Sequence, residues 1–133
     1  MRRLALALLL AAAPALAQEP CPFAGQRPML VVQLFFGQTI RGRGLVSNRS
    51  WQRFLAETVT PALSDGFTVY DGYGQWRDKR SGAIGREGTK VVVVAAEDTP
   101  EFRARVESVA AAYRRRFDQQ SVGVVAQPGC GAF

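Results

Sequence analysis

Apolar residues run almost without interruption through residues 29–36, and four consecutive valines lie within residues 83–96. Such runs are typical of strands that are buried on both faces. Weaker strand patterns cover residues 67–77 and 121–127. Gly72 and Gly74 predict a bulge in the second of these four strands. The turn-forming residues 78–82 would join the second strand to the third as a hairpin.

A first helical pattern lies between the first two strands. Ser47 is a natural N-cap, and Pro61 would limit the helix, after which Asp65-Gly66 would turn the chain. The spacing places four apolar residues on one helix face: Trp51, Phe54, Leu55 and Val59.

A second helical pattern follows the third strand and opens on Asp98-Thr99-Pro100-Glu101. Asp98 can cap this helix, Glu101 can reach back to the cap, and Pro100 suits the first turn. Its buried side is expected to carry Phe102, Val106, Val109, Ala110, Tyr113 and Phe117.

The order β-α-β-β-α-β predicts an α+β, ferredoxin-like fold, with a four-stranded antiparallel sheet in the order 4-1-3-2 and two helices on one face. The first and third strands are then central, yet both are apolar on their two sides. The sheet face without helices should therefore be covered. A second copy, sheet against sheet, is the simplest cover, and a ligand or a terminal segment are the alternatives.

The first residues have the pattern of a secretory signal peptide rather than of this fold. Arg2 and Arg3 precede an apolar run over residues 4–13, and Ala15-Leu16-Ala17 matches a signal peptidase site. The run is too short to span a membrane. We expect cleavage between Ala17 and Gln18, which leaves residues 18–133 as one periplasmic or secreted α+β domain.

Cys21 and Cys130 are the only cysteines. An even pair in an exported domain indicates a disulfide. The predicted sheet order supports it, because the end of the fourth strand would lie beside the start of the first. A lipid anchor on Cys21 is the alternative, although residues 18–20 lack the small side chains expected before a lipidated cysteine.

Composition excludes several classes of site. The chain has no histidine, which excludes Ser-His-Asp and Cys-His catalysis, the common zinc sites and a histidine-ligated haem. No phosphate-binding loop is present, so we expect no cofactor. The formal net charge of +6 is modest. With an export signal and no repeat of basic and aromatic residues, it does not indicate nucleic-acid binding.

The predicted second hairpin concentrates polar and aromatic side chains. If residues 78–82 form its turn, Gly74 lies near Arg86 and Tyr70 near Lys90. A glycine opposite an arginine leaves room for a small anion.

Two interpretations of this hairpin remain open. Arg86 and Lys90 could receive a carboxylate or phosphate against an apolar wall of Trp76 or Tyr73. Alternatively, Arg86 or Lys90 forms a structural ion pair with Glu87 or Asp71, and the aromatic side chains pack on the hairpin.

Several short motifs are distributed along the chain. They include Phe35-Phe36-Gly37, Val59-Thr60-Pro61 and Arg116-Phe117, and the most specific is Asp71-Gly72-Tyr73-Gly74-Gln75-Trp76-Arg77. With these motifs the chain resembles, over about residues 34–130, a bacterial family of exported proteins known as domain of unknown function 3574. The resemblance implies an exported domain without an assigned role or known catalytic residues.

These observations favour a non-enzymatic envelope domain, a homodimer, that binds a small ligand or a partner protein. The alternative is a cofactor-independent enzyme of the dimeric α/β-barrel type that acts on a small anionic substrate. Its acid or base would be Lys90, Tyr70 or Asp71, with Arg86 steering the substrate. This alternative requires a pocket of a few hundred Å³ that these side chains line.

Overall fold

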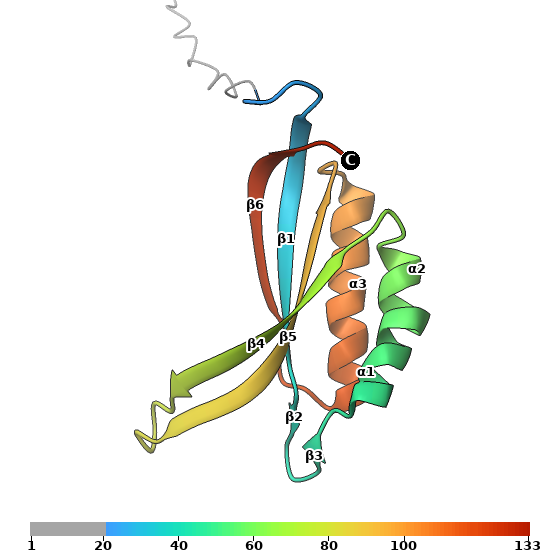
Figure 1. The fold of residues 1–133 in the computed structure, drawn as a ribbon. Coiled ribbons are helices and arrows are strands. Elements are labelled where there is room, and N and C mark those ends of the chain that lie inside the picture. The colour runs from blue at the N-terminus through green and yellow to red at the C-terminus, as the bar shows by residue number, and fades with distance from the viewer. Residues whose placement is uncertain (1–20) are drawn as a thin grey trace, which may run out of the picture.

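The computed structural model describes residues 21–133, so the expected cleavage site between Ala17 and Gln18 lies outside it. A four-stranded antiparallel sheet has the order β4-β5-β1-β6. This is the predicted order 4-1-3-2 read from the other edge, and the ferredoxin-like α+β fold is confirmed (Figure 1). The strands are β1 (Arg27–Gly37), β4 (Thr68–Arg77), β5 (Ile84–Ala96) and β6 (Gly123–Gly131).

The first predicted helix is one continuous helical segment of three parts, on the same face of the sheet as the second helix (Figure 1). Ser47 caps it as predicted, since its Oγ accepts a hydrogen bond from the Ser50 N–H at 3.1 Å. The π-helix in its middle ends two residues before Pro61, which has no N–H to donate to a carbonyl four residues back. The parts are α1 (Asn48–Phe54), the π-helix η1 (Leu55–Val59) and α2 (Thr60–Ala62).

Helix α3 (Pro100–Phe117) has the predicted buried side, and all six expected residues on it are buried. The predicted cap is wrong. Thr99, not Asp98, is the N-cap, and its Oγ1 accepts from the Phe102 N–H at 3.1 Å. Asp98 instead forms an ion pair with Arg103, with Nε and Oδ1 2.6 Å apart. The hydrogen bonds from Arg103 hold the pKa of Asp98 below its usual value.

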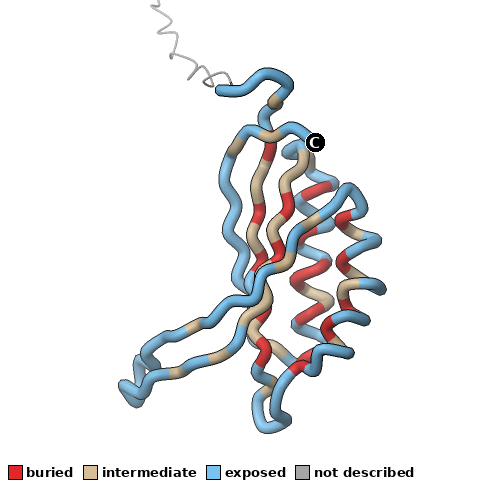
Figure 2. Tube along the Cα trace, in the orientation of Figure 1, coloured by how far each residue is buried: buried red, intermediate tan, exposed pale blue. Residues whose placement is uncertain are grey.

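The core between the helices and the sheet is aromatic at the end where β1 finishes. Phe36 packs edge-on against Tyr113 with ring centroids 4.7 Å apart, and Phe54 lies 5.2 Å from Tyr113. Trp51 and Phe117 complete this cluster, and all five side chains are buried. Figure 2 shows buried positions, among them Val32, Leu34 and Phe36, alternating with less buried ones along β1.

A buried polar link holds the end of β1 against α3. The Gln38 Nε2 donates to the Phe36 carbonyl at 2.9 Å and to the Tyr113 hydroxyl at 3.0 Å. The Tyr113 hydroxyl in turn donates to the Gly37 carbonyl at 2.8 Å. Burial raises the pKa of Tyr113, so its hydroxyl keeps the proton that it donates.

The segment after β1 forms a small hairpin of β2 (Thr39–Ile40) and β3 (Gly44–Leu45). Gln38 also fixes the two ends of this hairpin. Its N–H donates to the Gly88 carbonyl at 3.0 Å, and its carbonyl accepts from the Val46 N–H at 2.8 Å.

The β4–β5 hairpin differs from expectation by one residue of register. The Asp78 N–H pairs with the Ala83 carbonyl at 2.8 Å, so only four residues form the turn. Gly74 therefore lies opposite Glu87, and Asp71 opposite Lys90. No residue is skipped along the ladder, so the predicted bulge at Gly72 and Gly74 is wrong. Since side chains alternate along a strand, this shift moves each one to the other face relative to its expected partner.

The outer half of this hairpin, residues 72–89, extends beyond the helices (Figure 1) and is mostly exposed (Figure 2). Its turn is held by Asp78, whose Oδ1 accepts from the Ser81 N–H at 2.7 Å and the Arg80 N–H at 3.0 Å. These hydrogen bonds, with that from the Ser81 hydroxyl, hold the pKa of Asp78 below its usual value.

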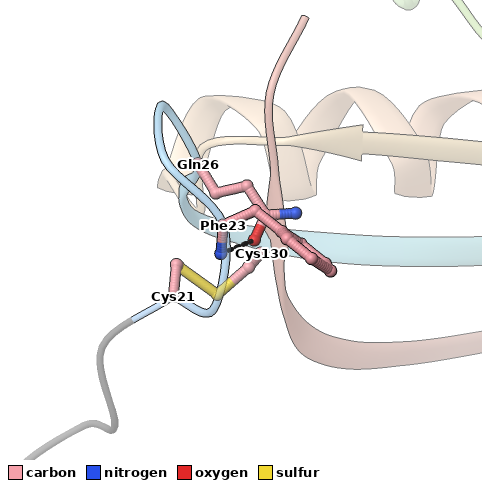
Figure 3. Close-up of a disulfide and its surroundings, with 4 residues drawn as sticks. All are labelled: Cys21, Phe23, Gln26 and Cys130. Atoms are coloured by element: carbon pink, nitrogen blue, oxygen red, sulfur yellow. Dashed lines mark hydrogen bonds between the residues drawn. A yellow bond between two sulfur atoms is a disulfide. The ribbon is translucent and has the colours of Figure 1, made fainter.

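Strand β6 is longer than predicted, because it continues through Pro128 to Gly131. Cys130 therefore lies within β6, opposite Pro28, rather than beyond its end. The expected disulfide joins it to Cys21 with the two Cα atoms 5.7 Å apart (Figure 3). No helix within residues 21–133 has the length and apolar character needed to cross a membrane.

Replacing both cysteines by serine should lower the free energy of unfolding by about 2–5 kcal/mol, because the bridge closes a long loop, with a sequence separation of 109. Denaturant titration of the oxidised protein and of the Cys21→Ser/Cys130→Ser variant measures this difference. Because the variant has no disulfide, adding a reductant should not change its free energy of unfolding. Equal unfolding free energies for the oxidised protein and the serine variant would contradict the prediction.

Candidate functional site

A groove of about 690 Å³ lies on the face of the sheet that the helices leave open. Its floor is formed by side chains from β1, β4 and β5, among them Phe35, Trp76, Glu87 and Thr89. Its walls come from the β2–β3 hairpin and from residues 118–121, which join α3 to β6. The groove thus combines segments that lie far apart in the sequence.

Trp76 lies against the backbone of the neighbouring strand, opposite Gly85. A Cβ atom at Gly85 would fall 2.6 Å from the Trp76 Cζ2, so any other residue would push the indole away. Half of the Trp76 side chain is nevertheless exposed, at 50 %. The indole therefore lies close to the backbone at Gly85, while half of its surface remains available to a ligand.

Glu87 is held in a similar way at the end of β1. A Cβ atom at Gly37 would fall 2.7 Å from the Glu87 Oε1, so glycine leaves room for the carboxylate there. The Thr39 N–H donates to the Glu87 Oε2 at 3.1 Å. Within residues 21–133 no basic side chain lies within 4.0 Å of this carboxylate.

Side-chain bonds join the two walls. Arg43 forms an ion pair with Asp118, with Nη2 and Oδ2 2.6 Å apart, and the Gln119 Nε2 donates to the Thr39 carbonyl at 2.8 Å. With the Gln120 amide turned so that its oxygen faces Arg41, that oxygen accepts from Arg41 Nη2 at 2.7 Å. Asp118 itself has a positive φ of 51° at the end of α3, which turns the chain toward the groove.

The structure does not bring the predicted ligand-binding residues together. Arg86, Lys90 and Tyr73 lie on one face of the β4–β5 hairpin, whereas Trp76 lies on the other. The Lys90 Nζ forms an ion pair with the Asp71 carboxylate, which was one of the two interpretations left open. The Arg86 Nε donates to the Gln75 Oε1 at 2.9 Å rather than to a carboxylate.

The residues considered as acid or base are also divided between the two faces. Tyr70 lies on the open face opposite Val91 and is 57 % exposed, while Asp71 and Lys90 lie on the other face. Of the site residues expected from sequence, only Trp76 lines the groove. Within residues 21–133 no group of three His, Cys, Asp or Glu side chains gathers that could hold a metal ion.

Sequence reasoning missed the walls of the groove. Arg41, Gln119 and Gln120 belong to short connecting segments that carry no periodic pattern. Glu87 was considered only as an ion-pair partner. The signal that could have indicated its role is Gly37, at the end of a strong strand.

The chain belongs to the family described as "Protein of unknown function (DUF3574)", whose model matches residues 32–133. This confirms the family resemblance inferred from the short motifs. No curated protein matches the chain.

Two solved structures share the architecture. A phage SAM lyase in complex with S-methyl-5'-thioadenosine matches with a TM-score of 0.60 and 15 % identity, over 90 % of this chain and 97 % of that chain. CutA1 from Oryza sativa matches with a TM-score of 0.54 and 12 % identity, over 83 % and 87 % of the two chains. At these identities the similarity shows the fold alone.

Gly85→Ala should displace the Trp76 indole into water, because the new methyl group would occupy its position. Quenching of tryptophan fluorescence by acrylamide should therefore increase, and the emission should shift to longer wavelength. Trp51, the other tryptophan, is 1 % exposed and should not contribute to the change. Gly88→Ala is the matched control, since a Cβ there meets nothing within 4 Å. Identical quenching of both variants would contradict the prediction.

Proposed function

We propose that this protein is an exported, non-enzymatic domain that binds a small ligand in the groove of the open sheet face. The observation that carries the proposal is that two groove side chains occupy space that only a glycine leaves open. Trp76 lies against Gly85, and the Glu87 carboxylate lies near Gly37. A site whose side chains are already held in place loses little conformational entropy when a ligand binds.

The size and composition of the groove support a small molecule as ligand. Its volume, about 690 Å³, lies within the range of roughly 300–1,000 Å³ that small-molecule sites occupy. Phe35 and Trp76 supply apolar surface, and a few polar groups such as Glu87, Thr89 and Arg41 can orient a ligand.

Export is supported by two features. The first seventeen residues have the pattern of a secretory signal, and the Cys21–Cys130 disulfide suits an oxidising compartment. We therefore assign the protein to the periplasm or the extracellular space, with residues 18–133 as its mature domain.

The enzyme alternative has less support. It assigns acid or base chemistry to Lys90, Tyr70 or Asp71 and substrate steering to Arg86, and none of these four lines the groove. The ammonium of Lys90 is neutralised by Asp71. The similar phage SAM lyase is an enzyme, but the shared feature is its fold. A turnover that is lost on Lys90→Ala or Arg86→Ala would favour this alternative over ours.

Native mass spectrometry of protein isolated from its own compartment should reveal a bound small molecule. The released molecule, added back to stripped protein, should quench Trp76 fluorescence, and Trp76→Ala should weaken its affinity at least about tenfold, as measured by calorimetry. Tyr73→Ala, on the other face of the hairpin, is the control and should bind normally. Unchanged affinity of Trp76→Ala would exclude the groove as the site.

We further propose that a second copy of the chain covers the part of the open face next to the groove. That part carries no charged side chain, so two copies can pack face to face without burying a charge. The residues on it come from all four strands: Val31, Gln33, Tyr70, Val91, Val93, Ala95 and Val125.

Light scattering of the mature protein at tens of micromolar should give the mass of a dimer. Val93→Lys places a charge at the centre of the covered face and should convert the dimer into a folded monomer. Gln52→Lys adds the same charge on an exposed position of α1 and should leave the dimer intact. A monomer mass for the unmodified protein at that concentration would argue against the second copy.

A further inference from the structure

We infer that the ligand of the groove is a zwitterion of the α-amino-acid kind, with a flat apolar side chain. The inference rests on the proposed binding function and specifies the chemistry of the ligand. It follows from three groups at the groove that the fold positions but leaves without a full partner: a carboxylate, a guanidinium and an indole.

The carboxylate of Glu87 can receive the ammonium group. Its Oε2 already accepts from the Thr39 N–H, whereas the side chain has no ion-pair partner within residues 21–133. Glu87 is half-buried at the groove and has no basic side chain beside it among the described residues, so a cation in the groove can form an ion pair with it. The Trp76 indole diagonally across the ladder adds an aromatic face, which also attracts a cation.

The guanidinium of Arg41 can receive the carboxylate. Of the two arginines on the β2–β3 hairpin, Arg43 is already paired with Asp118. Arg41 has only the neutral amide oxygen of Gln120 as a partner among the described residues. A guanidinium has five N–H donors and binds a carboxylate through two of them, so Arg41 keeps most of its donors for a ligand.

Glu87 and Arg41 line the same groove, and a single small molecule can contact both. Glu87 is bonded to Thr39, and Arg41 follows two residues later in the same wall. Arg41 is the first residue of the turn between β2 and β3, so its side chain and the Glu87 carboxylate line the same groove from neighbouring segments. One small molecule that carries both an ammonium and a carboxylate can therefore bond to the two groups at once.

The remaining lining determines the third part of the ligand. Phe35 forms part of the groove floor and is 36 % exposed, and the half-exposed Trp76 indole lines the same groove. A planar apolar side chain can stack on the indole, which favours aromatic over branched side chains.

Three probes that share a phenyl ring distinguish the contributions of the ligand's two charged groups. They are L-phenylalanine, phenethylamine, which lacks the carboxylate, and 3-phenylpropionate, which lacks the ammonium. Titrations followed by Trp76 fluorescence and calorimetry should show that phenylalanine binds at least about tenfold more tightly than either analogue.

Two variants assign each charge to its residue. Glu87→Gln keeps the acceptor for the Thr39 N–H and should weaken phenylalanine and phenethylamine about tenfold while 3-phenylpropionate is unaffected. Arg41→Gln should weaken phenylalanine and 3-phenylpropionate while phenethylamine is unaffected. Arg86→Gln removes a positive charge from the other face of the hairpin and should change none of the three affinities.

Other outcomes overturn the inference. Equal binding of phenylalanine and phenethylamine, unaffected by Arg41→Gln, means that the ligand is a simple cation, and the reverse pattern means a simple anion. In both cases the groove still binds a small ligand, and the proposed function stands. If no probe changes Trp76 fluorescence up to about 10 mM, the zwitterion is wrong, and the molecule found by native mass spectrometry decides the proposed function independently.

Discussion

The hydroxyl of Tyr113 lies where the aromatic core meets the end of β1, and the groove depends on that junction. It accepts from Gln38 and donates to the Gly37 carbonyl, which fixes the last residue of the strand against α3. Gly37 provides the space for the Glu87 carboxylate, and Gln38 fixes where the β2–β3 hairpin begins and ends. A buried link of three hydrogen bonds thus positions groups on the opposite face of the sheet. Because the link is buried among packed rings, an unpaired polar atom there would be costly, and this cost keeps the end of β1 in one position.

Most of the architecture could be predicted because it depends on periodicity. The buried side of α3 follows from the spacing of its apolar residues, and the strand order from the order of the helical and strand patterns. The pairing of Cys21 with Cys130 follows from their being the only two cysteines and from that strand order. The N-cap of α3 was harder, since Asp98 and Thr99 can both accept a backbone hydrogen bond. Thr99 is the cap because the helix begins one residue later than assumed, which leaves Asp98 free to pair with Arg103. Such choices depend on backbone geometry that composition does not reveal.

The candidate site could not be predicted, for a different reason. Whether Trp76 shares a face with Arg86 depends on the parity of the hairpin register, and the register depends on whether the turn has four residues or five. Asp78 decides this, since its backbone still pairs across the hairpin while its side chain closes the turn. The walls of the groove could not be predicted from the sequence for a second reason. Arg41 and Gln120 meet only because the β2–β3 hairpin and the end of α3 are brought together by the fold.

The outer half of the β4–β5 hairpin supplies Trp76, Glu87 and Thr89 to the groove but almost nothing to the core. Its side chains can therefore be replaced with little loss of folding free energy. Replacing Phe36 or Tyr113 in the core would instead lower the folding free energy of the whole domain. A large part of the groove and the packed core thus lie in different parts of the molecule. This separation makes the hairpin a place where a new recognition preference can be selected or engineered without rebuilding the scaffold that supports it.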